Sequence, residues 1–148
     1  MLEQTTAEQR FVVDTNVLIS RLLLPHGVAA QALDLALSRG VLLVSDATLT
    51  ELVEVLSRPK FDPYITQEER KEFIRKLGGI ARVVDIAWQD TVCRDPKDDK
   101  FLHAAVNGEA TVLLTGDKDL LVLHPFHGVE ILSPSIFLQT NSQENDNL

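Results

Sequence analysis

The feature that most constrains this chain is the alternation of short apolar segments with longer amphipathic ones. Five short segments are rich in Val, Leu and Ile and lack the strict alternation of a half-exposed strand; they lie at residues 11–14, 41–45, 80–86, 111–115 and 129–132. Such segments are typical of strands that are buried on both faces of a sheet. Because helical patterns connect them, we expect a parallel sheet with helices on both faces. The predicted fold is a three-layer α/β/α sandwich around a central parallel sheet of about five strands.

The connecting segments carry signals for where helices begin and end. The apolar residues before Gly40 recur on one helical face, and Gly40 is placed to end that helix. Thr66 and Glu69 form a capping-box pattern at the start of another helix, which we expect to end at Gly78 and Gly79.

The length of the chain suits a single domain. Its 148 residues can build one sizeable core, and we expect the domain to occupy residues 10–138. The flanking residues are polar, so we expect a leader at 1–9 and a flexible tail at 139–148.

The sequence favours a cytoplasmic protein. Cys93 is the single cysteine, so no internal disulfide can form, which fits a reducing compartment. No apolar stretch approaches the length that spans a membrane, and the N-terminus lacks the pattern of a signal peptide. We therefore expect no membrane partner.

The charge of the chain argues against a broad surface for nucleic acid. The formal net charge is −8 and the isoelectric point is about 4.9, whereas nucleic-acid-binding domains usually carry an excess of Lys and Arg. A nuclease is still compatible with this balance, because a cleft of carboxylates lowers the total while local cations contact phosphates.

Four acidic residues follow the predicted strands or begin the helices after them. Asp14 ends the first strand, Glu51 lies near the start of the helix after the second, Asp99 begins the helix of "DDKFLHAAV", and Asp117 follows "TVLLT". The carboxyl ends of strands in an open α/β sheet meet at one edge, where sites form. Converging carboxylates repel each other unless a cation neutralises them, and oxygen-only ligands suit Mg²⁺ or Mn²⁺. The pattern predicts a metal site at this edge.

Each carboxylate also has a purely structural interpretation. Asp14 can cap the helix at 17–24, and Thr48 with Glu51 has the spacing of a capping box. Helical spacing does not separate neighbouring acidic residues from one another. The alternatives that remain open are Glu54 for Glu51, Asp95 or Asp98 for Asp99, and Asp119 for Asp117.

Four segments, "VVDTNVLIS", "TELVEVL", "DDKFLHAA" and "LLTGDKDL", occur in the order of the acidic motifs of PIN-domain nucleases and resemble them. The resemblance spans roughly residues 10–138 and extends to the small prokaryotic members described as toxins of toxin–antitoxin pairs. It implies a PIN-like nuclease domain that cleaves single-stranded RNA with Mg²⁺ or Mn²⁺. The implied catalytic and metal-binding residues are Asp14, Glu51, Asp99 and Asp117, with Asn16, Asp98 and Asp119 in support.

The expected chemistry is phosphodiester hydrolysis by metal-activated water, which needs no covalent nucleophile. Cations beside the acidic motifs are expected to contact the RNA backbone; they are Arg94, Lys97, Lys100 and Lys118. Aromatic residues make up only 5% of the chain, and no platform for stacking bases is evident from the sequence. His103 departs from the family pattern, because many relatives carry a small residue there.

The resemblance also implies partners. We expect a cognate antitoxin protein, and a homodimer because the helical patterns at 28–40 and 46–58 hold more apolar residues than one small sheet needs. The alternative to an enzyme is a non-catalytic PIN-like module that binds RNA or protein, because a fold does not guarantee an activity.

Overall fold

Strand β1 (Gln9–Val13) lies at the centre of a five-stranded sheet in the computed structural model, which describes residues 8–146. The strand order is β3-β2-β1-β4-β5, and each neighbouring pair is parallel. The other strands are β2 (Gly40–Val44), β3 (Arg82–Val83), β4 (Val112–Leu114) and β5 (Glu130–Leu132). The predicted parallel sheet is confirmed.

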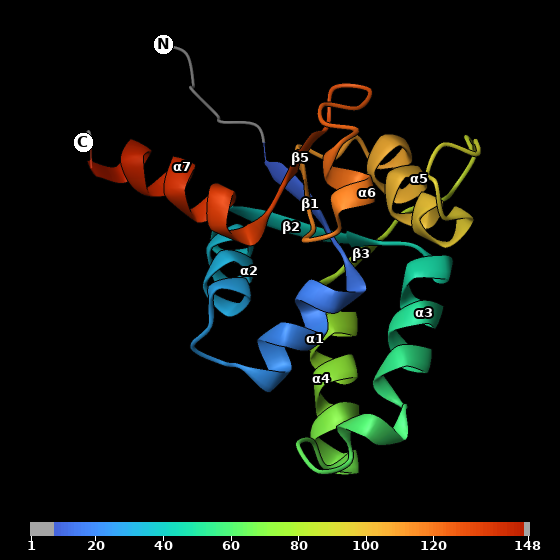
Figure 1. Cartoon of the computed structure of the whole chain (residues 1–148), viewed down its shortest axis with the longest axis vertical. Coiled ribbons are helices and arrows are strands. Elements are labelled where there is room, and N and C mark those ends of the chain that lie inside the picture. Colours follow the sequence, from blue (N-terminus) through green and yellow to red (C-terminus); the bar gives the residue numbers. More distant parts are fainter. Residues whose placement is uncertain (1–7, 147–148) are drawn as a thin grey trace.

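Helices cover both faces of this sheet, which confirms the three-layer architecture (Figure 1). Phe11 and Val13 of β1 point into one core, and Val12 between them points into the other. The first core is closed by α1 (Thr15–Leu23), α2 (Val28–Arg39), α3 (Asp46–Leu56), α4 (Gln67–Ile80) and α7 (Pro134–Asp146). The second is closed by α5 (Asp99–Asn107) and α6 (Lys118–Leu121).

The capping of α3 differs from the prediction. Ser45 caps the helix in a capping box with Thr48. The Ser45 hydroxyl accepts a hydrogen bond from the backbone N–H of Thr48, and the Thr48 hydroxyl accepts one from the backbone N–H of Ser45. Glu51 is therefore not needed as a capping residue. The capping box of Thr66 and Glu69 at the start of α4 is confirmed.

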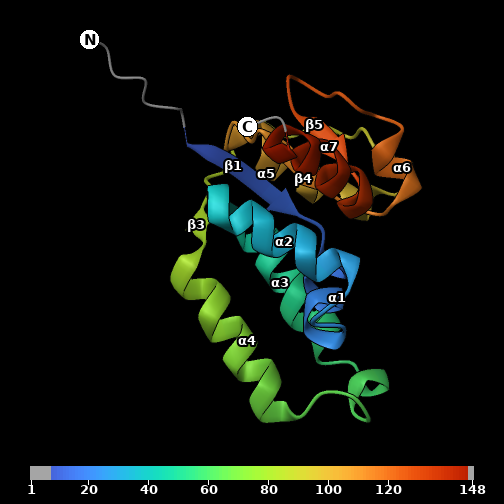
Figure 2. The ribbon, with the colours of Figure 1, turned by 90° about the vertical axis from the view of Figure 1, so that its left-hand side faces the viewer.

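The predicted strand at 80–86 is much shorter in the structure. Helix α4 continues through Gly78 and Gly79 to Ile80, because both glycines adopt helical geometry and the last turn is anchored by the buried Leu77. Only β3 remains to pair with β2, and both of its side chains are exposed. Figure 2 shows α4 and β3 at one border of the molecule.

The ends of the described chain also differ from expectation. Most of the predicted leader lies outside the described residues, and Gln9 already belongs to β1. Residues 139–146, expected in a flexible tail, continue helix α7. This helix packs on the sheet through Phe137, whose ring lies 5.7 Å from that of Phe11 between centroids, and Asn141 accepts a hydrogen bond from Arg39 of α2.

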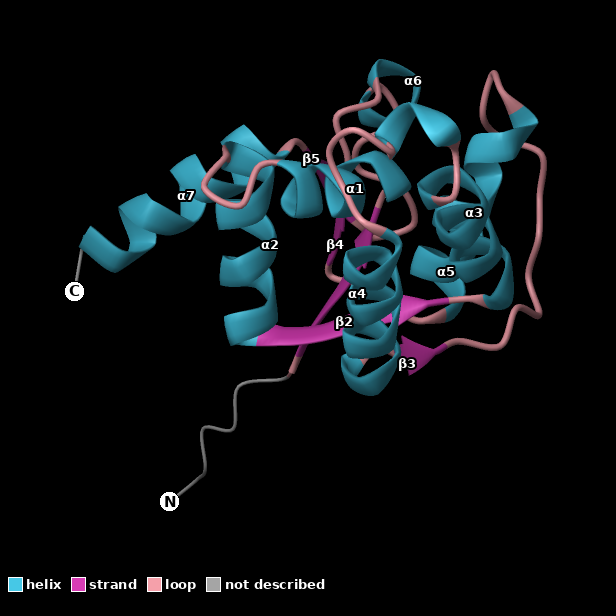
Figure 3. Ribbon diagram, turned by 90° about the horizontal axis from the view of Figure 1, so that it is seen from below, coloured by secondary structure: helices cyan, strands magenta, loops and turns pink. Residues whose placement is uncertain are grey.

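Residues 84–95 form a long loop between β3 and a short 3₁₀ helix, η2 (Pro96–Asp98), and Figure 3 shows it along the side of the molecule. A second 3₁₀ helix, η1 (Pro59–Phe61), joins α3 to α4. Among the residues that the structure describes, no helix is both long and apolar enough to cross a lipid bilayer.

Candidate active site

Asp14 occupies the point where β1 ends and α1 begins. Its side chain is only 6% exposed, and one carboxylate oxygen accepts a hydrogen bond from the backbone of Asn16 (3.1 Å), so Asp14 does cap α1. The other oxygen accepts a hydrogen bond from the Thr115 hydroxyl (2.7 Å) at the end of β4. The capping interpretation and the site interpretation are thus compatible, because each uses a different oxygen.

Asp117 repeats this arrangement at the end of β4. Its carboxylate accepts a hydrogen bond from the backbone of Asp119 (2.8 Å) and caps the short helix α6, which the sequence patterns did not predict. The backbone N–H of Asp117 donates to the hydroxyl of Thr115 (3.0 Å). Thr115 therefore links the carboxyl ends of β1 and β4 through Asp14 and Asp117.

Asp98, at the end of η2, completes a group of three aspartates with Asp14 and Asp117. Burial, the charge of Asp117 and a hydrogen bond between their carboxyl groups raise the pKa of Asp98 to about 6, and the charge of Asp14 contributes. Burial also raises the pKa of Asp14, although its hydrogen bonds from Thr115 and Asn16 oppose the change. Asp14 and Asp117 follow β1 and β4 at one edge of the sheet, and the charges of both act on Asp98.

Asp99, which the sequence analysis placed at the principal ligand position, is engaged differently from Asp98, and its role as an ion ligand stays a prediction. Its buried carboxylate accepts hydrogen bonds from the backbone of Cys93 (2.7 Å) and Val92 (3.1 Å). Burial opposes the ionisation of Asp99, but these hydrogen bonds hold its pKa below the ordinary value. The two neighbours differ because Asp98 still belongs to the 3₁₀ turn, whereas Asp99 is the first residue of α5.

Glu51 approaches the group from α3. Its carboxylate accepts a hydrogen bond from Thr15 (2.5 Å) and forms an ion pair with Lys100 (2.6 Å). The charge of Glu51 acts on Asp14, whereas Glu54, the other candidate on this helix, is exposed. The prediction of Glu51 over Glu54 agrees with this geometry.

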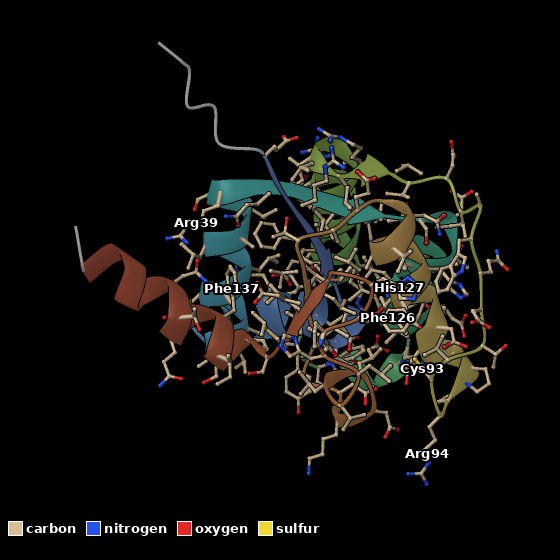
Figure 4. All side chains as sticks on the ribbon, turned by 90° about the horizontal axis from the view of Figure 1, so that it is seen from above. Arg39, Cys93, Arg94, Phe126, His127 and Phe137 are labelled. Carbon is tan, nitrogen blue, oxygen red and sulfur yellow. The ribbon has the colours of Figure 1, made fainter. Side chains whose placement is uncertain are left out.

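The predicted RNA-contacting cations fall into two kinds. Lys100 is half-buried and already paired with Glu51, so it forms part of the acidic site. Arg94, Lys97 and Lys118 are exposed, and the side chain of Arg94 extends away from the chain in Figure 4. They supply local positive charge beside the acidic group in a chain whose net charge is −8.

The chemistry of the donor atoms fits Mg²⁺ or Mn²⁺, because the group offers carboxylate oxygens without sulfur or imidazole. Within the described residues, no three Asp, Glu, His or Cys side chains are already arranged to hold one ion. Ion binding therefore requires these carboxylates to turn towards each other. Burial is the largest cause of the raised pKa values of Asp14 and Asp98, and the charges of neighbouring carboxylates add to it.

Sequence reasoning missed the two threonines that position the acidic side chains. Thr15 and Thr115 are both buried and donate hydrogen bonds to Glu51 and Asp14. The spacing of Thr115 two residues before Asp117 is a usual signal for a hydroxyl that accepts from a turn backbone. That spacing could have indicated Thr115, whereas the contact of Thr15 with Glu51 depends on the packing of α1 against α3.

Comparisons with known proteins agree with this architecture. Residues 10–119 match the sequence profile of the PIN domain. An uncharacterized protein of Methanocaldococcus jannaschii, MJ1680, is 32% identical over 116 residues, which cover 77% of this chain and 74% of that protein.

Two solved structures share the fold at low sequence identity. VapBC2 from Rickettsia felis, bound to a DNA fragment from their promoter, aligns with a TM-score of 0.60 at 14% identity over 84% of this chain and 98% of the solved one. PAE2754 from Pyrobaculum aerophilum aligns with a TM-score of 0.60 at 16% identity over 95% and 94% of the two chains.

Proposed function

Since this chain belongs to the PIN-domain family, we propose that it is a Mg²⁺- or Mn²⁺-dependent endoribonuclease that hydrolyses phosphodiester bonds in single-stranded RNA. The observation that carries the proposal is the convergence of Asp14, Asp98 and Asp117 from three separate segments on one sheet edge. Burial and the charges of the neighbouring carboxylates both disfavour ionisation there, and a divalent cation would offset both effects.

In this proposal the residues have distinct tasks. Asp14, Asp98 and Asp117 hold the ion, and Glu51 joins them when it turns away from Lys100. Thr115 and Thr15 orient Asp14 and Glu51 through their hydrogen bonds. The bound ion supplies a water of lowered pKa and stabilises charge on the phosphate. Asn16 and Asp119 hold their aspartates through backbone N–H groups.

The remaining cations bind the substrate. Arg94, Lys97 and Lys118 are exposed near the acidic group and contact phosphates of the RNA, each releasing counterions. Lys100 contacts a phosphate only after its ion pair with Glu51 opens.

We also propose that the protein acts in the cytoplasm as the toxin of a toxin–antitoxin pair. The resemblance of its acidic motifs to those of the small PIN toxins supports this role, and VapBC2 from Rickettsia felis shares the fold. We propose a homodimer as well, because Val28 of α2 and Val53 of α3 are each 51% exposed on helices that the sequence marks as rich in apolar residues.

The second candidate is a PIN-like module that binds RNA or protein without cleaving it. The observation in its favour is that no three of the described acidic, His or Cys side chains are already arranged to hold an ion. The two candidates differ in one measurable respect, since the module would bind RNA equally well with or without metal and leave it intact.

The experiment that separates them is cleavage of an end-labelled RNA pool by purified wild-type protein in Mg²⁺, Mn²⁺ or EDTA. We expect cleavage in both metals and none in EDTA. Asp14→Asn serves as the inactive control, because it keeps the shape of the cap but removes a charge. Equal cleavage by this variant would identify a contaminating nuclease, and binding without cleavage would favour the module.

A further inference from the structure

Four rings gather on the outer side of α5 although aromatic residues are scarce in this chain. Trp88 lies in the 84–95 loop, His103 on α5, and Phe126 with His127 in the connection from α6 to β5. The Trp88 ring centroid lies 5.7 Å from that of His103, 6.3 Å from Phe126 and 5.2 Å from His127. Because these residues come from three separate segments, no sequence pattern revealed the cluster. We refer to these four residues as the aromatic surface.

Side chains of α5 hold the backbone of the Trp88 loop in place. The Asn107 amide oxygen accepts hydrogen bonds from the backbone of Ala87 (3.1 Å) and Trp88 (2.9 Å), and its nitrogen donates to the Trp88 carbonyl (2.8 Å). The Nε2 atom of His103 lies 3.1 Å from the backbone nitrogen of Asp90 and 2.8 Å from its carbonyl oxygen, and its tautomer decides whether it accepts from the first or donates to the second. The backbone at Trp88 is therefore held against α5 although this loop forms no helix or strand. This role also accounts for His103, where the family pattern has a small residue.

The aromatic surface is more than an extension of the hydrophobic core. Phe126 packs against the core under α5, but Trp88 is half-buried and is not among the described side chains that build either core. His127 is exposed and lies over Phe126, with 4.4 Å between ring centroids and 30° between planes. Figure 4 shows these two residues next to each other. His127 is thus the exposed member of this ring cluster, and Trp88 and Phe126 are partly exposed beside it.

The backbone at His127 is held in an uncommon conformation. Its φ is +49°, in the left-handed region that non-glycine residues rarely adopt. Phe126 and Val129 exchange two backbone hydrogen bonds (3.0 and 2.8 Å) around it, which fixes the turn. Such conformations persist where the surroundings impose them, and they are frequent at functional surfaces.

The aromatic surface and the acidic site share the same elements. Asp98 immediately precedes α5, and His103 lies about one helical turn, or ~5.4 Å, beyond the start of that helix. Asp117 caps α6, whose chain continues to Phe126 and His127. Arg94 and Lys97 are exposed and lie between Trp88 and Asp98 in the sequence. Two cations therefore separate the aromatic surface from the acidic site along the chain.

We propose that the aromatic surface stacks a base of the RNA substrate while a phosphate of the same strand lies at the acidic site. This proposal rests on the proposed function, because it assigns a subsite for the same RNA. Stacking on a ring face tolerates any base, which suits a subsite that positions a single strand without reading its sequence. The exposed Arg94 and Lys97, close in sequence to Asp98, are available to contact phosphates of the same strand.

Trp88 is the single tryptophan of the chain, so its fluorescence reports directly on this surface. The experiment titrates the full-length protein with a short single-stranded oligoribonucleotide, in Mg²⁺ with the emission read before cleavage and in EDTA, where the RNA stays intact. An abasic oligomer of the same length and charge is the matched probe. We expect the oligoribonucleotide to quench the Trp88 emission and the abasic oligomer to leave it unchanged.

Affinity for the same RNA, carrying a fluorescent label, is then measured by anisotropy with variants. His127→Ala should weaken binding about tenfold, the loss of one stacked ring (about 1.4 kcal/mol). His26→Ala is the matched control, because His26 is also exposed but lies in the connection between α1 and α2. Trp88→Ala should weaken binding at least as much, and Trp88→Phe should restore most of it.

The results separate this proposal from the proposed function. If RNA binds tightly and is cleaved in the presence of metal without a change in Trp88 emission, the stacking subsite is refuted and the proposed nuclease function is retained. Quenching without cleavage in any metal would support the subsite and refute the nuclease. Equal quenching by the abasic oligomer would overturn the subsite, since contacts to phosphate would then account for the quenching. Emission that changes with protein concentration in the absence of RNA would also overturn it, since a second copy of the chain would then cover the aromatic surface.

Discussion

Asp98 and Asp99 are adjacent in the sequence, yet their carboxyl groups have opposite electrostatic surroundings. Asp98 faces Asp117 and Asp14, and burial together with their charges raises its pKa to about 6. One carboxylate oxygen of Asp99 accepts two backbone hydrogen bonds, which hold the pKa of Asp99 below the ordinary value despite burial. At the scale of one residue, Asp98 is therefore suited to meet a cation, while Asp99 holds the loop before η2 in place.

This contrast predicts different defects for the two asparagine variants. Asp98→Asn should abolish RNA cleavage and leave the fold intact, because it removes charge from a repelling cluster. Asp99→Asn should lower the free energy of unfolding by about 1 kcal/mol, since hydrogen bonds to a charged acceptor are stronger than those to a neutral one. Cleavage assays and urea denaturation of both variants test this. Full activity of Asp98→Asn together with an inactive, stably folded Asp99→Asn would restore the original assignment.

The sequence could indicate most of the acidic group but not its last member. Asp14 and Asp117 were predictable because each directly follows an apolar strand, and parallel strands end at the same edge. Glu51 was predictable because it lies off the apolar stripe of its helix. The choice between Asp98 and Asp99 depends on where the 3₁₀ turn gives way to α5, a boundary that helical periodicity does not specify.

At the scale of elements, two glycines have contrasting roles. Gly40 joins α2 to β2 and pairs with Gln9 of β1, and a Cβ atom there would lie 2.0 Å from the Gln9 carbonyl oxygen. Gly79 lies inside α4, and a Cβ atom there would meet nothing within 4 Å. The first glycine is required by close approach of two backbones, and the second is not required by packing.

These surroundings predict opposite effects of alanine. Gly40→Ala should cost at least about 3 kcal/mol or prevent folding, because a strand backbone cannot move aside. Gly79→Ala should raise the free energy of unfolding by about 0.5–1 kcal/mol, since alanine loses less entropy in a helix. Denaturant titration of both variants gives the comparison. A stabilised Gly40→Ala or a clearly destabilised Gly79→Ala would contradict the packing described for these elements.

The same two glycines explain which elements could be predicted. The strands of the central sheet were evident because they are buried on both faces, and Gly40 was correctly expected at the end of a helix. The glycines of α4 were wrongly expected to end it, since a helix anchored by buried Leu77 tolerates them and includes Ile80, the first residue of the expected strand. Helix α7 was underestimated because its polar sequence hides the contact between Phe137 and Phe11.

At the scale of the whole molecule, the acidic group should make stability depend on pH. The folded-state pKa of Asp98 is about 6 against an ordinary value of 3.8, and that of Asp14 is also raised. The folded protein therefore takes up protons that the unfolded chain does not, as the pH falls through about 6. The stabilisation from these two groups is present below their ordinary pKa values and is lost as the pH rises.

We accordingly expect the ion-free protein to melt at a higher temperature at about pH 5 than at about pH 7.5. Asp98→Asn should melt above wild type at the higher pH by a few degrees, because about 1 kcal/mol moves the midpoint of a chain this size by roughly 2–4 °C. The melting temperatures of this variant at the two pH values should also differ by less than those of wild type. Thermal melts in EDTA measure both effects. An identical pH dependence in the variant would show that ionisation of Asp98 does not destabilise the folded protein.

A divalent cation should relieve the same penalty at neutral pH. An ion that binds only the folded state at about 100 times its dissociation constant adds about 2.7 kcal/mol, which corresponds to roughly 5–10 °C for a chain of this length. We therefore expect Mn²⁺ or Mg²⁺ to raise the melting temperature and EDTA to reverse the gain.

The variants Asp14→Asn and Asp98→Asn should lose most of this rise in melting temperature. Asp46→Asn should keep the rise, because Asp46 is an exposed acidic residue in the first turn of α3. An unchanged midpoint in wild type at millimolar metal would exclude an ion site that is coupled to folding, and with it the hydrolytic role of the acidic group.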